Sequence, residues 1–380
     1  MEPPSWRPLE GQAHRIAVEV LVHGPVPRGQ IARRLGLSPA TLSRLTKPLI
    51  EAGLLFEVDP RPPEGRGRPS RPLDIDPSSR HFIGVKITAE KAHGVLTDIR
   101  AKVIDCQVAP FAERSPEGVV KTVAELAASL GSQVGQITAL GVSAAGLTKD
   151  YQILRHAPYL GWEPDVPLAA MLREATGLAT AVDNDVAAWT EAERWFGDGR
   201  DRPDFALVTT GAGVGYNLVT HRHRASGPDV GVGLLGHVPL DPLGPLCSAG
   251  HQGCAEAMLT TGALAARVSA ATGRPVTYER SLELAAQGDP AARAAVTAAA
   301  RAYGRLLALI ANTTFVPFII ASGEGVDLAI AHRDLVRDEF AAGRSDHASP
   351  VEILLKPAPF TEWARGAAVV AIQTYVLGRA

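Results

Sequence analysis

Arginines suited to contacting a polyanion lie in a short segment rich in glycine and proline. Residues 60–72 read PRPPEGRGRPSRP and contain Arg61, Arg66, Arg68 and Arg71. Arginines spaced along an extended arm can enter a narrow A·T minor groove of DNA. A plain linker is the alternative, but a linker has no reason to alternate arginine with glycine. The segment therefore predicts a DNA-contacting arm that relies on Arg66 and Arg68.

A carboxylate suited to handling hydroxyl groups lies further along the chain. Asp185 follows Asn184 at the predicted start of a helix over 185–197, where backbone amides can hold a carboxylate that accepts from a hydroxyl. The same pair can serve simply as a helix cap, and taken alone the cap is the better interpretation. A glycine-rich run over 210–215 could approach a phosphate, but such a run is weak evidence for a nucleotide.

The elements that would position the arginines form a helix-turn-helix. An apolar-periodic helix ends near residues 24–25, a second covers 27–36, and Ser38 with Pro39 starts a third that ends at Gly53. Strands over 54–59 and 73–76 flank the arginine segment as a wing. We expect Pro48 to kink the C-terminal half of the third helix. Its polar face would contact bases through Thr41, Ser43, Arg44 and Lys47, whereas an ordinary helical hairpin would leave that face in solvent.

Charge and composition agree with one end meeting an anionic partner. Residues 1–80 hold twelve Lys and Arg against nine Asp and Glu, although the whole chain has a net charge of −2. Three cysteines make no disulfide framework, and neither a signal peptide nor a membrane-spanning apolar run is evident. We expect a cytoplasmic protein with no membrane association.

From residue 81 strands alternate with helices, which indicates α/β lobes. We expect strands within 81–109, 138–146, 205–213 and 318–322. Predicted helices cover 116–130, 167–176, 185–197, 254–272, 290–311 and 363–378.

Two segments give this region a specific resemblance. Residues 182–197, VDNDVAAWTEAERWFG, and the long run over 208–257 resemble the signatures of the ROK family of repressors, open reading frames and kinases. The resemblance spans residues 12–380. It implies an α/β fold with an N-terminal winged helix-turn-helix over 1–76 and a two-lobed, actin-like sugar-kinase domain of ribonuclease-H type over 77–380. The lobes would cover about 77–198 and 199–380, with the last helix packing back on the first lobe.

The resemblance also implies a sugar site. Asp185 takes the position of the general base of family kinases, Asn184 would bind a neighbouring hydroxyl, and His237 and Glu256 match sugar-contacting positions. Two positions depart from the family pattern. Leu234 replaces a glutamate that grips sugar hydroxyls, and Tyr159 stands where many members have asparagine.

The first phosphate loop departs most. Family kinases have Asp-x-Gly-Gly-Thr after the first strand, where this chain has Lys86-Ile87-Thr88-Ala89-Glu90. Both glycines and the metal-organising aspartate are gone, so we expect no phosphoryl transfer and no enzyme activity. We interpret the glycines of 210–215 as serving a tight turn.

The resemblance further implies zinc. Its usual ligands are a histidine, here His237, and three cysteines, of which Cys247 and Cys254 are present and Ala249 replaces the third. His251 could complete a Cys2His2 set, and two buried cysteines at a dead site are the alternative.

Together these features predict a transcriptional regulator of carbohydrate metabolism that binds a double-stranded DNA operator and a sugar-like effector. We expect a homo-oligomer, a dimer or a tetramer. Two alternatives remain. One is an active ATP-dependent sugar kinase with a DNA-binding appendage, and the other is a regulator whose kinase-like body binds no small ligand.

Overall fold

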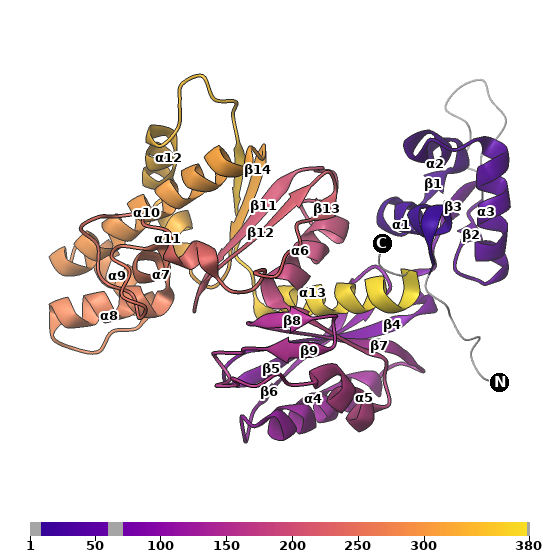
Figure 1. The fold of residues 1–380 in the computed structure, drawn as a ribbon, viewed down its shortest axis with the longest axis horizontal. Coiled ribbons are helices and arrows are strands. Elements are labelled where there is room, and N and C mark those ends of the chain that lie inside the picture. Colours follow the sequence, from indigo (N-terminus) through magenta and orange to yellow (C-terminus); the bar gives the residue numbers. More distant parts are fainter. Residues whose placement is uncertain (1–8, 60–70, 378–380) are drawn as a thin grey trace. The chain divides into compact units, whose positions relative to one another are not determined.

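The computed structural model describes residues 9–59 and 71–377 of the chain. Contacts divide the chain into two compact units (Figure 1). The first comprises residues 1–200 and 360–380, and the second comprises residues 201–359.

The first unit begins with a small domain of three helices and a three-stranded sheet. The helices are α1 (Gly11–His23), α2 (Arg28–Leu35) and α3 (Pro39–Glu51), and the antiparallel sheet has the order β1 (Val26–Pro27), β3 (Pro72–Asp74), β2 (Phe56–Glu57). Strand β1 was not expected, because a two-residue strand leaves no periodic pattern. The helices enclose an apolar core of fully or almost fully buried side chains, namely Ile16, Val20, Leu21, Ile31, Leu42 and Leu49.

Sequence signals at the helix ends explain how this domain forms. Gly36 ends α2 with φ of 65°, a left-handed conformation that favours glycine. Ser38 then caps α3 by accepting a hydrogen bond from the Thr41 amide at 3.1 Å, and Pro39 occupies the first helical position. The helix continues through Pro48 to Glu51 as one element.

The rest of the first unit is a five-stranded sheet with helices on both faces. The sheet has the order β10 (Thr180–Asn184), β7 (Ile137–Ala144), β4 (His81–Ile87), β5 (Lys91–Asp98), β6 (Val103–Pro110). Strands β4, β7 and β10 are parallel, whereas β4, β5 and β6 are antiparallel. The remaining elements are α4 (Pro116–Gly131), β8 (Leu147–Lys149), β9 (Ile153–Arg155), α5 (Leu168–Thr176), α6 (Asp185–Phe196), α13 (Phe360–Ile372) and the π-helical η3 (Gln373–Leu377).

Two glycines let α13 lie directly on this sheet, opposite α4 and α5 (Figure 1). A Cβ atom on Gly84 would lie 2.0 Å from the Ala364 carbonyl oxygen, and one on Gly141 would lie 1.8 Å from that of Ala367. Only glycine therefore permits this close packing between the strands and the helix backbone.

The second unit has its own five-stranded sheet and a cluster of helices. The sheet order is β13 (His223–Arg224), β12 (Val214–Thr220), β11 (Phe205–Thr210), β14 (Phe318–Ser322), β15 (Glu352–Leu355). The helices are the 3-10 turn η2 (Leu234–His237), α7 (Ala255–Leu259), α8 (Thr261–Thr272), α9 (Tyr278–Ala286), α10 (Pro290–Thr314), α11 (Val326–Ala331) and α12 (Arg333–Ala342).

Helix α10 is the central helix of this unit's core. It is long and apolar enough to cross a membrane by length and composition, but 67% of its most apolar window is buried inside the structure. Such burial is typical of the core helix of a soluble protein.

The predicted helix over 254–272 proves to be two helices. Thr260 ends α7 and caps α8, because its hydroxyl accepts a hydrogen bond from the Ala263 amide at 3.3 Å. A threonine inside an apolar run gave too weak a signal to locate this break.

Candidate functional sites

Helix α3 presents a polar face to solvent. Ser43, Arg44 and Lys47 are exposed, and Thr41 is half-buried with its hydroxyl 2.9 Å from that of Ser38. Lys47 is 3.8 Å from Glu51. Arg44 and its neighbours can therefore reach a partner without disturbing the buried side of the helix. Arg66 and Arg68 lie outside the described residues.

The base of the arginine-rich segment is held by an ion-pair network that sequence reasoning did not find. Arg28 donates to Thr46 Oγ1 at 2.7 Å and to Glu57 Oε1 at 2.8 Å, and Arg71 is 3.3 Å from Glu57 Oε2. The hydrogen bond from Arg28 lowers the pKa of Glu57. Arg71 is thus an ion-pair partner of Glu57, whereas the sequence suggested only a solvent-facing arm.

Asn184 and Asp185 lie buried at the junction of β10 and α6. The Asn184 side chain caps α6 by accepting from the Ala187 amide at 3.1 Å and donates to the Gly146 carbonyl at 3.0 Å. Asp185 Oδ1 accepts from the Val186 amide at 2.8 Å. Asn184 is therefore a helix cap, and its side chain already accepts from one backbone group and donates to another.

Lys86 forms a buried ion pair with Asp185. Its Nζ contacts Asp185 Oδ2, and the two residues are 5% and 7% exposed. The same ammonium lies 5.1 Å from the ring centroid of Trp363 on α13. The sequence marked Lys86 as a charge reversal, but no local pattern could identify a partner 99 positions away.

In the second unit the glycine-rich turn after β11 is filled by a carboxylate. A Cβ atom on Gly211 would lie 2.0 Å from Glu324 Oε2, and the Gly325 amide donates to the Thr210 carbonyl at 2.7 Å. Gly211 has no positive φ, and its amide donates to the Gly213 carbonyl at 3.0 Å. The residue therefore serves a tight turn and also leaves room for the Glu324 carboxylate. Glu324, within SGEG after β14, was not singled out from the sequence.

Three candidate metal ligands come together in the second unit. The ligand atoms of His237, Cys247 and Cys254 all lie within 4.8 Å of one another. Cys247 Sγ is 3.8 Å from His237 Nδ1. A tetrahedral zinc site places its ligands roughly this far apart, given bonds of about 2.0–2.3 Å, so the donor set fits a metal.

A tight loop positions these ligands. The Cys247 amide donates to the His251 carbonyl at 3.0 Å, and the Gly253 amide donates to the Pro245 carbonyl at 2.7 Å. Gly253 has φ of 55°, and a Cβ atom there would lie 1.6 Å from the Asp241 carbonyl oxygen. Burial raises the pKa of Cys247, but the amides of His251 and Ala249 and a hydrogen bond with Cys254 lower it, and the pKa of this thiol is lowered overall.

The other two predicted residues lie beside this group. His251 Nδ1 is 3.6 Å from Cys247 Sγ, and its ring centroid is 4.7 Å from that of His237. Glu256, in the first turn of α7, has Oε2 3.7 Å from His237 Nε2 and accepts from the Ser248 hydroxyl at 3.0 Å. His237 can therefore offer Nδ1 to a metal while Nε2 faces a carboxylate, an arrangement that orients metal-bound histidines.

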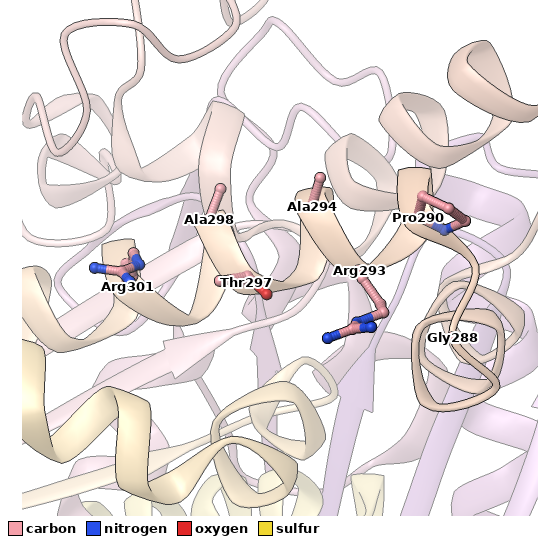
Figure 2. Close-up of a pocket in the computed structure, with 7 residues that line it drawn as sticks. All are labelled: Gly288, Pro290, Arg293, Ala294, Thr297, Ala298 and Arg301. Carbon is pink, nitrogen blue, oxygen red and sulfur yellow. The ribbon is translucent and has the colours of Figure 1, made fainter.

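A separate surface pocket of about 510 Å³ lies along the exposed side of α10 (Figure 2). It is lined by Gly288, Pro290, Arg293, Ala294, Thr297, Ala298 and Arg301. None of the predicted site residues lines it.

Known proteins are similar to this chain over most of its length. The sequence model of the ROK family matches residues 82–372. The DNA-binding transcriptional repressor Mlc of Escherichia coli is 24% identical over 303 residues, which cover 76% of this chain and 75% of Mlc. The DNA-binding transcriptional dual regulator NagC of the same organism is 27% identical over 332 residues, which cover 83% of this chain and 81% of NagC.

Solved structures give the same fold. A ROK family transcriptional regulator, described as a homologue of the Escherichia coli protein Mlc, superposes with a TM-score of 0.81 and 22% identity over 96% of both chains. A ROK family glucokinase from Streptomyces griseus gives a TM-score of 0.66 and 25% identity over 77% of this chain and 99% of the kinase. The expected fold class, a winged helix-turn-helix with an actin-like domain, is therefore confirmed.

Proposed function

Because this chain belongs to the ROK family, we propose that it is a DNA-binding transcriptional regulator that responds to a sugar-like effector. Its curated relatives Mlc and NagC are DNA-binding regulators, and the matched residues cover three quarters or more of each. The solved regulator matches almost all of this chain, whereas the glucokinase leaves about a quarter of it unmatched.

Helix α3 is the proposed recognition helix, which would contact the bases of the operator. Its exposed Ser43, Arg44 and Lys47, with Thr41 at its first turn, would face base edges in a major groove. Arg66 and Arg68 would enter the adjacent minor groove.

The observation that carries the choice of regulator over kinase is the Lys86–Asp185 ion pair. A kinase needs this carboxylate free to take a proton and needs an acidic group nearby for magnesium. In this chain a buried ammonium holds the carboxylate, so protonation of Asp185 would leave Lys86 charged and unpaired in the interior.

The second phosphate loop supports the same conclusion. The Glu324 carboxylate packs against Gly211, where a nucleotide phosphate would need backbone donors and positive charge. We therefore propose that the protein transfers no phosphate.

The effector would be a polyhydroxylated, sugar-like molecule. In the first unit Asp185 offers carboxylate oxygens that can accept from sugar hydroxyls, beside the amide of Asn184. In the second unit Glu256 offers carboxylate oxygens and His237 a ring nitrogen, which are also groups that bind hydroxyls. The identity of the sugar would differ from that of family kinases, because Leu234, at the position of a family glutamate, cannot accept a hydrogen bond.

His237, Cys247 and Cys254, with His251 as the fourth ligand, would hold one zinc ion. The metal would brace the loop over 245–254 and supply no reaction chemistry. Glu256 would then orient His237 from the other side of the ring.

The working form would be a cytoplasmic homo-oligomer, a dimer or a tetramer. One recognition helix contacts few base pairs, so two copies of the domain would bind two half-sites of one operator.

Selection of genomic DNA fragments with the full-length protein tests this function. Wild-type protein should enrich a small set of fragments over bulk DNA by about a thousandfold or more in affinity. Arg44→Ala should lose about 1–3 kcal/mol of discrimination at one base position of those fragments, because a bidentate contact to guanine is removed. Failure of wild-type protein to enrich any fragment at low salt would refute the proposal.

A turnover assay addresses the kinase alternative. Incubation with ATP, magnesium and a panel of hexoses, pentoses and amino sugars should release no ADP above background. Turnover that disappears in the double variant Lys86→Met/Asp185→Asn, which leaves no buried charge unpaired, would establish the kinase and overturn our assignment.

A further inference from the structure

A turn of the five-stranded sheet reaches the DNA-binding domain within the first unit. Between β5 and β6 the chain reverses at residues 98–102, where Asp98 Oδ1 accepts from the amides of Arg100 and Lys102 at 2.8 and 3.0 Å. Ala101 has φ of 54°, and the Ile99 and Ala101 side chains are buried. The turn is therefore a fixed structure that presents Arg100 in one direction.

Arg100 contacts two elements of the DNA-binding domain at once. Its guanidinium donates from Nε to the Leu21 carbonyl at 3.2 Å and from Nη2 to the Val20 carbonyl at 3.4 Å. It also forms an ion pair with Asp74 at the end of β3. A cation at the end of α1 is favoured by the helix dipole. The Val20 carbonyl accepts from the Gly24 amide at 2.8 Å as well, so Arg100 joins the hydrogen bond that ends the helix.

The contact between Arg100 and Asp74 is partly buried and closely packed. The side chains of Arg100 and Asp74 are only 24% and 14% exposed, so water screens their attraction weakly. Gly24 is also required at this point, because a Cβ atom there would lie 2.4 Å from the Val20 carbonyl oxygen. The same Cβ atom would lie 2.4 Å from Asp74 Oδ1 and 2.7 Å from Arg100 Nη2.

The connection between the two parts is short and ordered as well. Six residues, 75–80, join β3 to β4, and within them Asp76 caps the 3-10 turn η1 (Pro77–Ser79). Ile75 is fully buried, and the Ile99 amide donates to the Pro77 carbonyl at 3.4 Å. A flexible linker of six residues would have a root-mean-square end-to-end distance of about 13 Å. That distance corresponds to roughly four base-pair steps along DNA.

We propose that Arg100 is a positioning residue that fixes the orientation of the DNA-binding domain on the first lobe. It thereby sets the half-site spacing that a dimer accepts. This inference rests on the proposed function, since it concerns how that function selects its operator. With Arg100 in place the recognition helix has one orientation relative to the sheet that carries Lys86 and precedes Asp185. Without it the helix keeps its fold but samples several orientations.

The test measures affinity against half-site spacing. A half-site taken from a fragment that the wild-type protein enriches is placed twice in one duplex, with the separation increased one base pair at a time over about two helical turns. Wild-type protein should prefer one spacing over its neighbours about tenfold or more. Arg100→Met, which keeps the length of the side chain, should reduce that ratio about fivefold or more and leave affinity for a single half-site unchanged.

Two further variants control the result. Lys102→Met removes one positive charge from the same turn at an exposed position and should behave as wild type. Asp74→Asn breaks the ion pair from the other side while its amide oxygen can still accept from the Ile75 amide, and it should reproduce the loss of spacing preference. If Arg100→Met proves poorly folded by circular dichroism, Asp74→Asn decides the question.

Retention of the narrow spacing preference in Arg100→Met or Asp74→Asn would overturn the inference, as would its loss in Lys102→Met. The proposed function fails separately, because in that case the wild-type protein itself binds no fragment.

Discussion

At the scale of single residues, Lys86 carries our choice of a regulator over a sugar kinase. Its ammonium stands at the end of β4, where a kinase has the aspartate that organises magnesium, and it holds Asp185 in an ion pair that is almost completely buried. Since a buried charge is costly without its partner, each residue now depends on the other for the stability of the fold.

This dependence gives a prediction about unfolding free energy. Asp185→Asn and Lys86→Met should each destabilise the protein by about 3–5 kcal/mol, because each leaves one buried charge unpaired. The double variant should recover most of the loss, since no charge is left unpaired. Urea denaturation measures all three, and additive losses in the double variant would contradict the pairing. A variant that removes Asp185 alone is therefore a poor probe of effector binding.

A second prediction at this scale concerns the fourth metal ligand. Elemental analysis of wild-type protein grown in zinc-replete medium should find about one zinc per chain, as structural sites of this type hold one ion. His251→Ala should lower the zinc content, and His237→Ala should abolish it. Full zinc content in His251→Ala would show that water or another group completes the site.

At the scale of elements, the sequence predicted best those helices and strands that have a clear apolar period or a recognisable cap residue. The apolar period and the Ser38-Pro39 start identified α3, and the alternating strands and helices identified both α/β lobes. Short pieces such as β1, β8 and β13 were missed, because two or three residues carry no period.

For the candidate sites, the sequence predicted the residues that lie in motifs but not the residues that contact them. Family motifs identified Asp185, His237, Cys247 and Cys254 as candidates. The partner of Asp185, Lys86, lies 99 positions away in the chain. Arg100 and Glu324, which contact other residues, lie on turns that carry no motif. Pairings across such distances depend on packing, which a local pattern cannot reveal.

The loop over 245–254 gives a prediction that belongs to an element. Gly253→Ala should displace the loop and lower zinc content, because its Cβ atom would collide with the Asp241 carbonyl. Gly250→Ala is the matched control: Gly250 also has a positive φ, of 84°, but its Cβ atom would meet open space. That control should cost about 1 kcal/mol of stability and keep its zinc. Equal zinc loss in both variants would refute the role assigned to the contact with Asp241.

At the scale of the whole molecule, the distribution of charge and the oligomeric state both concern how the protein would bind DNA. The N-terminal eighty residues carry an excess of positive charge on a chain whose net charge is −2, so association with DNA should depend on that end. Light scattering at micromolar concentration should give an even multiple of the 40.0 kDa chain mass, because two half-sites require paired domains. A monomer both with and without operator DNA would exclude this assembly.

The central claim is that a sugar-like effector controls operator binding without phosphoryl transfer. Its most direct test is the affinity of the full-length protein for a labelled operator fragment, measured by fluorescence anisotropy with each sugar of a panel and with no ATP present. We predict that one class of sugar changes the dissociation constant by about 5–150-fold, the usual range of coupling between two sites. An operator affinity that no sugar changes, or that changes only when ATP is added and consumed, would contradict the claim.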